Sequence, residues 1–454
     1  MRQIFYLTAI FFSIIFLYAC SNPPKSTSGK NIHLIPADMD SIYTAVQKGT
    51  FQYFWDGAEP NSGLARERYH VDGVYPQNDK MVVTSGGGGF GVMAILIGME
   101  RKWITREQGI ERLEKIVNFL ETADTYHGVW PHWWNGETGK TKPFSRYDDG
   151  GDLVETSFML QGLLCVRQYL QNGTAREKAL AKRADDLWRA VDFNWYRNGQ
   201  NTLYWHWSPN HAWRMNFPVR GYNECLIMYV LAASSPTHAV PAEVYHEGWA
   251  KNGAIKGSTT KYGYTLQLKH NGAEEYGGPL FWAHYSYLGL DPRGLKDQYA
   301  DYWKENQNQA LINYNWCVEN KLGYKGYGPN SWGLTSSYSV RGYAGHAPGE
   351  KRDLGVIAPT AALASMPYTP KESMAAMHHW YTTKKDSLWG PYGFYDAFSE
   401  TANWHPQRYL AIDQGPIVVM MENHRTGFIW DLFMSSPEIK TGLKKLGFES
   451  PHLK

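Results

Sequence analysis

Twelve segments with apolar residues at helical spacing follow one another along the chain, and they constrain its fold more than any other feature. Several begin at Asp, Ser or Pro, which favour helix starts. Loops rich in Gly, Trp and Tyr separate them, and two short stretches, 203–206 and 262–268, have strand-like composition. The sequence predicts helices over residues 40–55, 85–100, 106–125, 152–171, 175–195, 221–233, 241–251, 278–288, 296–320, 359–366, 370–383 and 412–423.

The helical part of the chain shows neither an internal repeat nor a linker that would divide it in two. Twelve helices in one domain pack most simply as six antiparallel pairs closed into a ring. We therefore predict an all-α fold, an (α/α)6 barrel, made by a single domain over residues 38–454. Long loops at one end of the ring would form a cleft.

The N-terminal residues indicate a lipoprotein signal peptide over residues 1–19. Arg2 precedes an almost wholly apolar run, 4–19, that is too short for a stable membrane span. Residues 17–20, Leu-Tyr-Ala-Cys, are similar to a bacterial lipobox, so we expect lipidation at Cys20 and a flexible tether over residues 20–37. An ordinary secretory signal is the alternative. The expected location is the cell envelope, periplasmic or anchored at the outer membrane.

The balance of charge excludes several classes of partner. The chain has 45 Lys and Arg against 43 Asp and Glu, and the basic residues are scattered. The sequence has no basic stripe that would predict binding to nucleic acid or to an anionic membrane. We therefore expect the protein to contact the membrane through its lipid anchor only. We expect a monomer.

The remaining cysteines and a glycine motif predict no cofactor and no metal. Cys165, Cys225 and Cys317 sit beside apolar residues, which indicates buried free thiols, although one disulfide is an alternative. Residues 86–91 match GxGxxG, but no parallel-sheet pattern surrounds them. They are better explained as a tight entrance to the helix over 85–100.

Residues 146–155 concentrate acids that suit chemistry on sugars. Four carboxylates occur there, Asp148, Asp149, Asp152 and Glu155, shortly after the aromatic run 130–134. Acids transfer protons and flat rings hold sugar faces, so the pattern is typical of enzymes that cleave sugar polymers. Asp152 and Glu155 are also spaced as a capping box for the helix that follows, and the two interpretations are compatible.

Aromatic residues make up 15% of the chain, which is more than a core alone requires. Sugar stacking and core packing are equally open for each tryptophan. Two arginines are candidates to bind hydroxyl groups, or else to pair with neighbouring acids and backbone. The predicted substrate-binding residues are Trp130, Trp133, Trp205, Trp207, Trp282, Trp404, Arg66 and Arg214.

Several longer motifs resemble the bacterial "glucoamylase-like" proteins of glycoside hydrolase family 144, whose members cleave β-1,2-glucan. The resemblance runs from about residue 40 to residue 435, nearly the whole mature chain, and it implies an (α/α)6 catalytic barrel. The motifs lie at residues 54–67, 221–224, 277–281, 357–362, 412–416 and 422–423.

The resemblance also implies which acids are essential, namely Asp148, Asp152, Glu155 and Glu224, with Asp413 as a further candidate. It implies an anomer-inverting hydrolase, which needs a protonated acid and an ionised base roughly 6.5–9.5 Å apart. Glu224 begins an apolar segment where burial would raise its pKa, which suits the acid. A helix-start charge is its alternative role. Asp148 and Asp413 compete for the base, and Asp413 is alternatively a helix cap.

One departure from the family concerns residue 338. Many relatives have Ala-Ser-Asp after Gly-Leu-Thr, whereas here Thr335 is followed by Ser-Ser-Tyr338. Tyr338 would alter a subsite if the family's acid contacts sugar. The sequence therefore leaves open endo or exo action and the linkage cleaved. A non-catalytic glycan-binding lipoprotein, a hydrolase of another glucan linkage and a polysaccharide lyase are the competing hypotheses.

Overall fold

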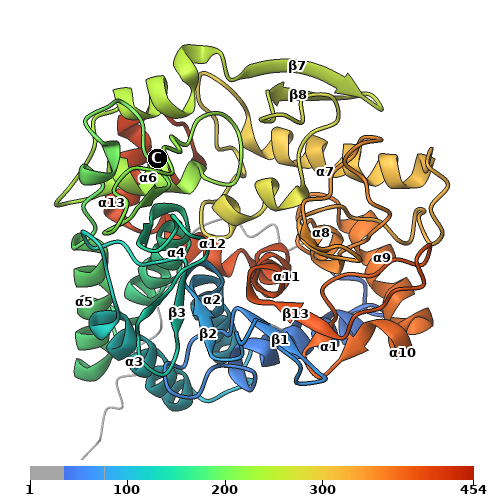
Figure 1. The fold of residues 1–454 in the computed structure, drawn as a ribbon, viewed down its shortest axis with the longest axis horizontal. Coiled ribbons are helices and arrows are strands. Elements are labelled where there is room, and N and C mark those ends of the chain that lie inside the picture. The colour runs from blue at the N-terminus through green and yellow to red at the C-terminus, as the bar shows by residue number, and fades with distance from the viewer. Residues whose placement is uncertain (1–34, 76) are drawn as a thin grey trace, which may run out of the picture. The chain divides into compact units, whose positions relative to one another are not determined.

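An inner and an outer layer of helices alternate along the chain in the computed structural model, which describes residues 35–75 and 77–454 (Figure 1). The predicted signal peptide, Cys20 and most of the predicted tether lie outside the described residues. The outer helices are α1 (Asp40–Trp55), α3 (Arg106–Thr122), α5 (Ala175–Arg189), α7 (Tyr302–Glu319) and α9 (Pro370–Thr383). The inner helices are α2 (Ser85–Glu100), α4 (Leu153–Leu170), α6 (Leu226–Ser234), α8 (Pro359–Leu363) and α11 (Ala411–Thr426).

The inner helices pack side by side in a ring. α2 contacts α4 and α11, α4 contacts α6, and α8 contacts α11. A π-helix over Val244–Trp249 and two 3-10 turns, Leu280–Ala283 and Tyr285–Tyr287, complete the alternation between α6 and α7. The predicted all-α (α/α)6 barrel is thus confirmed, with irregular turns in its fourth pair.

Burial explains why the two layers differ in sequence. All residues of α6 and α8 are buried, and in α2 only Glu100 is exposed. A helix that is apolar all round must be enclosed, whereas the outer helices α3 and α5 carry one apolar face and a capping box at each start.

The glycines of α2 allow the inner helices to approach closely. A Cβ at Gly89 would lie 2.4 Å from the Cα of Met159 in α4, and one at Gly87 would lie 2.6 Å from the Cβ of Ala411. Backbone contact at this distance tolerates only glycine. Two glycines of the GxGxxG match also lie at packed positions, since a Cβ at Gly91 would lie 2.6 Å from Phe54 Cδ1 and one at Gly88 would lie 3.1 Å from Leu64 Cδ2.

Several predicted helices are wrong in part. The segment 221–233 becomes helical only at Leu226 and the segment 296–320 only at Tyr302, and the segment 175–195 ends as an α-helix at Arg189. The segments 241–251 and 278–288 form π and 3-10 turns instead of α-helices. Three short helices were not predicted: α10 (Lys385–Leu388), α12 (Phe428–Met434), which packs on α4 and α11, and α13 (Pro437–Lys445), which packs on α6.

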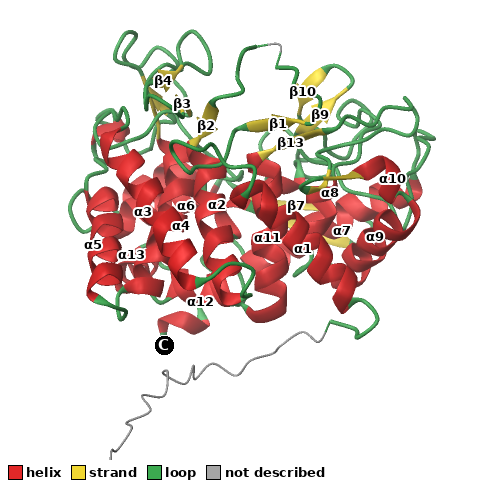
Figure 2. Cartoon of the chain, turned by 90° about the horizontal axis from the view of Figure 1, so that it is seen from below, coloured by secondary structure: helices red, strands yellow, loops and turns green. Residues whose placement is uncertain are grey.

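Most of the short strands gather at one end of the helices (Figure 2). β1 (Arg68–His70) pairs with β13 (Arg408–Leu410), β2 (Val82–Thr84) with β3 (Trp133–Asn135), β3 with β4 (Thr141–Lys142), and β9 (Ser337–Ser339) with β10 (Gly342–Ala344), all antiparallel. The other pairs are β5 (Gly151–Asp152) with β6 (His206–Trp207), β7 (Lys256–Lys261) with β8 (Tyr264–Leu268), and β11 (Trp389–Gly390) with β12 (Gly393–Phe394).

Two further expectations meet the structure here. Cys165, Cys225 and Cys317 are buried free thiols, as predicted. Among the described residues, every helix is too short or too polar to cross a membrane.

Candidate active site

A cavity of about 500 Å³ opens where inner helices α2, α4, α6 and α11 begin. Helix N-termini carry partial positive charge, which favours carboxylates placed there. Acidic, basic and aromatic side chains line this cavity together. Its polar and aromatic lining includes Glu67, Arg68, His70, Asp79, His132, Trp133, Phe144, Glu155, Trp205, Glu224, Phe281, Tyr285, Tyr338, Tyr343 and Arg408.

A second cavity of about 320 Å³ adjoins the first. The two share His132, Phe144 and Trp205, and the second adds Asp148, His206 and Phe217. The acid cluster therefore borders both cavities, with Glu155 lining the first and Asp148 the second.

Glu224 lies directly before α6 and lines the first cavity. Ser286 fixes the backbone at this point. Its hydroxyl donates to the Glu224 carbonyl and accepts from the Ile227 N–H at 3.0 Å. Burial raises the pKa of Glu224 to about 7, and the nearby charges of Glu155 and Asp152 act in the same direction. A carboxyl that keeps its proton near neutral pH can act as a general acid.

Glu155 stands in the first turn of α4 and lines the same cavity. Its Oε2 accepts the Gly86 N–H at 3.0 Å, and burial raises its pKa to about 7. Asp152 caps α4, since its Oδ1 accepts the Glu155 N–H at 2.9 Å. The predicted capping box is therefore half wrong: the Glu155 side chain turns to Gly86 on α2 instead of back to Asp152.

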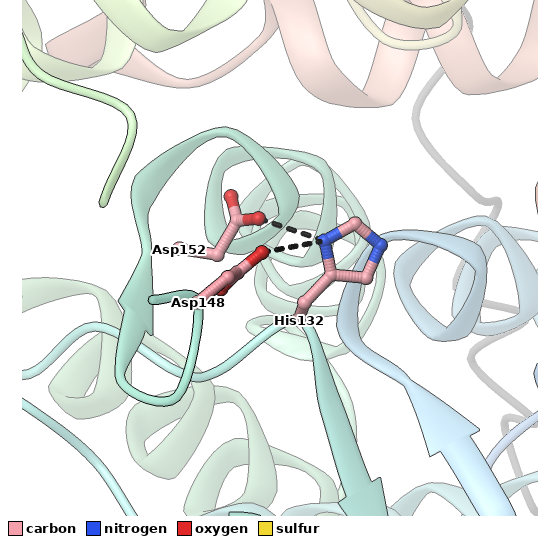
Figure 3. A group of neighbouring side chains, drawn as sticks. All are labelled: His132, Asp148 and Asp152. Atoms are coloured by element: carbon pink, nitrogen blue, oxygen red, sulfur yellow. Dashed lines mark hydrogen bonds and ion pairs between the residues drawn. The ribbon is translucent and has the colours of Figure 1, made fainter. Parts of the chain in front are cut away.

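His132 joins two of the predicted acids (Figure 3). Its Nδ1 lies 2.9 Å from Asp152 Oδ2 and 4.0 Å from Asp148 Oδ2. Burial lowers the pKa of His132, but the charges of Glu155, Asp152 and Asp148 outweigh it and raise the pKa to about 10. The imidazole is thus a cation at neutral pH, and it stabilises the surrounding carboxylates.

His206 approaches the same cluster from β6, with Nδ1 3.3 Å from Asp148 Oδ1. Trp205 donates its Nε1–H to Asp152 Oδ2 at 3.0 Å. Neither histidine was predicted, although His132 lies inside the aromatic run and could have been found there. The antiparallel pairing of Asp152 with His206 is long-range and has no local signal.

The atoms of His132, Asp148 and Asp152 lie within 4.8 Å of one another, a spacing that a metal ion could also use. The contact of 2.9 Å between His132 Nδ1 and Asp152 Oδ2 is accounted for by a shared proton, and Asp152 Oδ2 also accepts from Trp205.

Asp413 lies in the first turn of α11 but lines neither cavity. Leu410 is the N-cap of this helix and Asp413 makes no cap hydrogen bond, so the alternative role as a cap is wrong. Asp413 is linked to the first cavity through Tyr285, whose hydroxyl donates to its Oδ1 at 3.4 Å. Burial raises the pKa of Asp413 well above its usual range.

Comparison with known proteins identifies the family of this chain. An endo-β-1,2-glucanase from Chitinophaga pinensis, solved in complex with sophorotriose and glucose, is 72% identical over 91% of this chain and 99% of its own, with a TM-score of 0.91. The chain belongs to glycoside hydrolase family 144. The family model Glycoamylase matches residues 216–437.

Two less similar proteins extend the comparison of this family 144 member. The exo-β-1,2-glucooligosaccharide sophorohydrolase (non-reducing end) of Parabacteroides distasonis is 44% identical over 431 residues, covering 90% of this chain. The match spans 58% of that relative's length. An endo-β-1,2-glucanase mutant from Talaromyces funiculosus, solved with β-1,2-glucan, is 10% identical over 90% of each chain with a TM-score of 0.65, so it shares the fold alone.

Two of the six predicted tryptophans, Trp133 and Trp205, line the first cavity of this family 144 member. Trp130 is only 1% exposed, and its Nε1–H donates to the Leu120 carbonyl at 3.3 Å. The prediction that Trp130 binds sugar is therefore wrong, because the core encloses both faces of its ring. Trp207, Trp282 and Trp404 border neither of the two cavities.

The predicted arginines lie elsewhere. Arg66 Nη1 donates to the Lys80 carbonyl, and the Arg214 guanidinium lies 4.7 Å from the centre of the Tyr147 ring, so neither borders the two cavities. Arg68 and Arg408 line the first cavity instead.

Tyr338, the residue expected to alter a subsite, borders the first cavity. Its hydroxyl lies 3.0 Å from His70 Nε2. A phenol here gives the wall an aromatic surface with one polar end.

Proposed function

We propose that this chain is a glycoside hydrolase that cleaves β-1,2-glucan by general acid–base catalysis, with inversion at the anomeric carbon. The observation that carries the proposal is the pair of buried carboxyl groups, Glu224 and Glu155, whose pKa values lie at about 7 in a cavity walled by aromatic rings. Perturbed carboxyl groups in a cleft are typical of glycosidase sites. The 72% identity to an endo-β-1,2-glucanase supports the choice of glucan.

Glu224 is the proposed general acid. Its carboxyl faces the cavity and holds a proton near neutral pH, so it can protonate the leaving oxygen of the glycosidic bond. Asp148 and Asp413 are the candidate bases, reached through the second cavity and through Tyr285 respectively. Asp152, with His132, positions the acid cluster.

A panel of glucans tests the substrate. We expect release of reducing ends from β-1,2-glucan at least tenfold faster than from β-1,3-, β-1,4- or α-1,4-glucans, because the cavity would have to present a different ring face for each linkage. Reducing-end assays measure the rates, and product size separates endo from exo action. Equal or greater activity on α-1,4-glucan would contradict the proposal. NMR of the first products should show the inverted anomer.

We also propose that Cys20 is lipidated and anchors the mature protein to the cell envelope. The support is the run over residues 4–19 followed by Leu-Tyr-Ala-Cys. Replacing Cys20 with Ser should release active protein from the membrane fraction, because the helical domain needs no lipid to fold. Immunoblots of membrane and soluble fractions measure this. Unchanged membrane association of Cys20→Ser would disprove lipidation.

A further inference from the structure

Two aspartates meet behind the wall of the first cavity. Asp413 projects from the first turn of α11, and Asp396 lies between β12 and β13, where its N–H donates to the Arg408 carbonyl at 2.9 Å. Both side chains are buried, with relative exposures of 2% and 4%. The two carboxyl groups are close enough to interact directly, and the charge of Asp396 raises the pKa of Asp413.

The hydrogen bonds around the pair leave room for one proton between them. Asp396 Oδ2 accepts the Tyr338 N–H at 2.7 Å, and Asp413 Oδ1 accepts the Tyr285 hydroxyl at 3.4 Å. The remaining oxygens, Asp396 Oδ1 and Asp413 Oδ2, are buried and have no hydrogen-bond partner in the described part of the chain, so both are available to a shared proton. Two ionised carboxylates have no hydrogen to share, so a bond between them requires a proton on one.

The surroundings oppose a second negative charge on the pair. Glu67 adds a further negative charge that raises the pKa values of both aspartates, and its ion pair with Arg68 balances this charge in part. The hydrogen bond from the Tyr285 hydroxyl lowers the pKa of Asp413, but burial and the charge of Asp396 outweigh it. Burial raises the pKa of Asp396 to about 6, and burial together with Asp396 raises that of Asp413 further. Asp396 accepts a shorter hydrogen bond, from the Tyr338 N–H, than Asp413 accepts from Tyr285. The negative charge is therefore better stabilised on Asp396, and the resting proton sits on Asp413.

We propose that Asp396 and Asp413 share a single proton and act as one unit, with Asp396 as the positioning residue that sets the protonation state of Asp413. The role of this unit in catalysis rests on the proposed function. The singly charged pair can accept one more proton, and the Tyr285 hydroxyl connects it to the cavity.

In the hydrolytic step this proton comes from the attacking water. The water oxygen bonds to the anomeric carbon, the glycosidic C–O bond breaks, and Glu224 gives its proton to the leaving oxygen. The pair becomes neutral and Glu224 becomes ionised. Exchange with solvent then returns one proton to Glu224 and removes one from the pair.

Infrared spectroscopy of the unliganded full chain tests the shared proton directly. At about pH 9, Glu155 and Glu224 are ionised, and we expect wild type to keep a protonated-carboxyl C=O band. Asp396→Asn and Asp413→Asn should each abolish that band, because removing either charge lets the remaining aspartate ionise. Asp353→Asn is the matched control: Asp353 is buried but accepts from Trp316 at 2.8 Å and Tyr327 at 2.7 Å, and its loss should leave the band unchanged. Absence of the band in wild type, or its persistence in either Asn variant, would overturn the proposal.

Kinetics separate a proton role from a structural one. Asp396→Asn should lower kcat by about tenfold or more with KM near wild type, because the amide keeps the shape but carries no shared proton. A raised KM with unchanged kcat would show that Asp396 only shapes the cavity wall. If no glucan is cleaved while the infrared result is as expected, the proposed function fails and the shared proton stands.

Discussion

Replacing Glu224 with Gln should reduce kcat on β-1,2-glucan by a hundredfold or more, within the roughly 10²–10⁴ that general acid–base groups contribute. The amide keeps the size of the side chain and loses the transferable proton, so folding and KM should change little. Steady-state kinetics and a thermal melt measure the two effects. If Glu224 were only a helix-start charge, the melting temperature would fall slightly and turnover would stay near normal.

Glu137→Gln is the control for the loss of one negative charge, because Glu137 is exposed in the turn between β3 and β4. It should have wild-type kinetics. Asp148→Asn and Asp413→Asn complete the series, and the true base should lose activity about as severely as Glu224→Gln. Near-normal turnover in Glu224→Gln, Asp148→Asn and Asp413→Asn alike would contradict the assignment of the acid and the base.

The pH profile gives a further check on the same residue. A general acid works only while protonated, so activity should fall as the pH rises through about 7, the pKa of Glu224. The negative charge of Glu155 helps to hold that pKa up. Glu155→Gln should therefore move the alkaline limb to lower pH.

The largest effect on stability is expected from Gly89→Ala. The new Cβ would lie 2.4 Å from backbone atoms of Phe158 and Met159, which belong to α4 and cannot rotate away. Overpacking usually costs about 1–3 kcal/mol, and backbone contact puts this substitution at or above the upper end. Thermal or urea unfolding followed by circular dichroism measures it, and low yields of folded protein would agree.

Gly328→Ala is the matched control, because a Cβ there meets nothing within 4 Å. Its free energy of unfolding should stay within about 1 kcal/mol of wild type. A Gly89→Ala variant as stable as Gly328→Ala would show that α2 and α4 can move apart, contrary to the packing described.

The layered helical architecture could be predicted from sequence because helical periodicity is a local property. The predicted limits of α1, α2 and α9 coincide with the observed ones, and all twelve predicted segments follow the outer and inner alternation. The fourth pair could not be predicted in detail, since its π and 3-10 turns depend on packing against neighbours such as α6 and α7.

Local sequence also indicated that acids and aromatic rings occur together in residues 130–155, and the family resemblance pointed to Glu224 and Asp413. Local sequence could not decide which of these side chains line the same cavity. Trp130 and Trp133 stand three residues apart in one aromatic run, yet the first is enclosed by the core and the second borders the cavity.

The sequence by itself determined a chain of alternating helices with a concentration of acids and aromatic rings. Only the tertiary structure decided the chemistry of the individual groups. It placed Gly86 against Glu155, His206 against Asp148, and Asp396 against Asp413, which are contacts between distant parts of the chain. The pKa of a carboxyl depends on burial and on charges a few ångströms away, and both are set by how the helices close into a ring rather than by neighbouring residues.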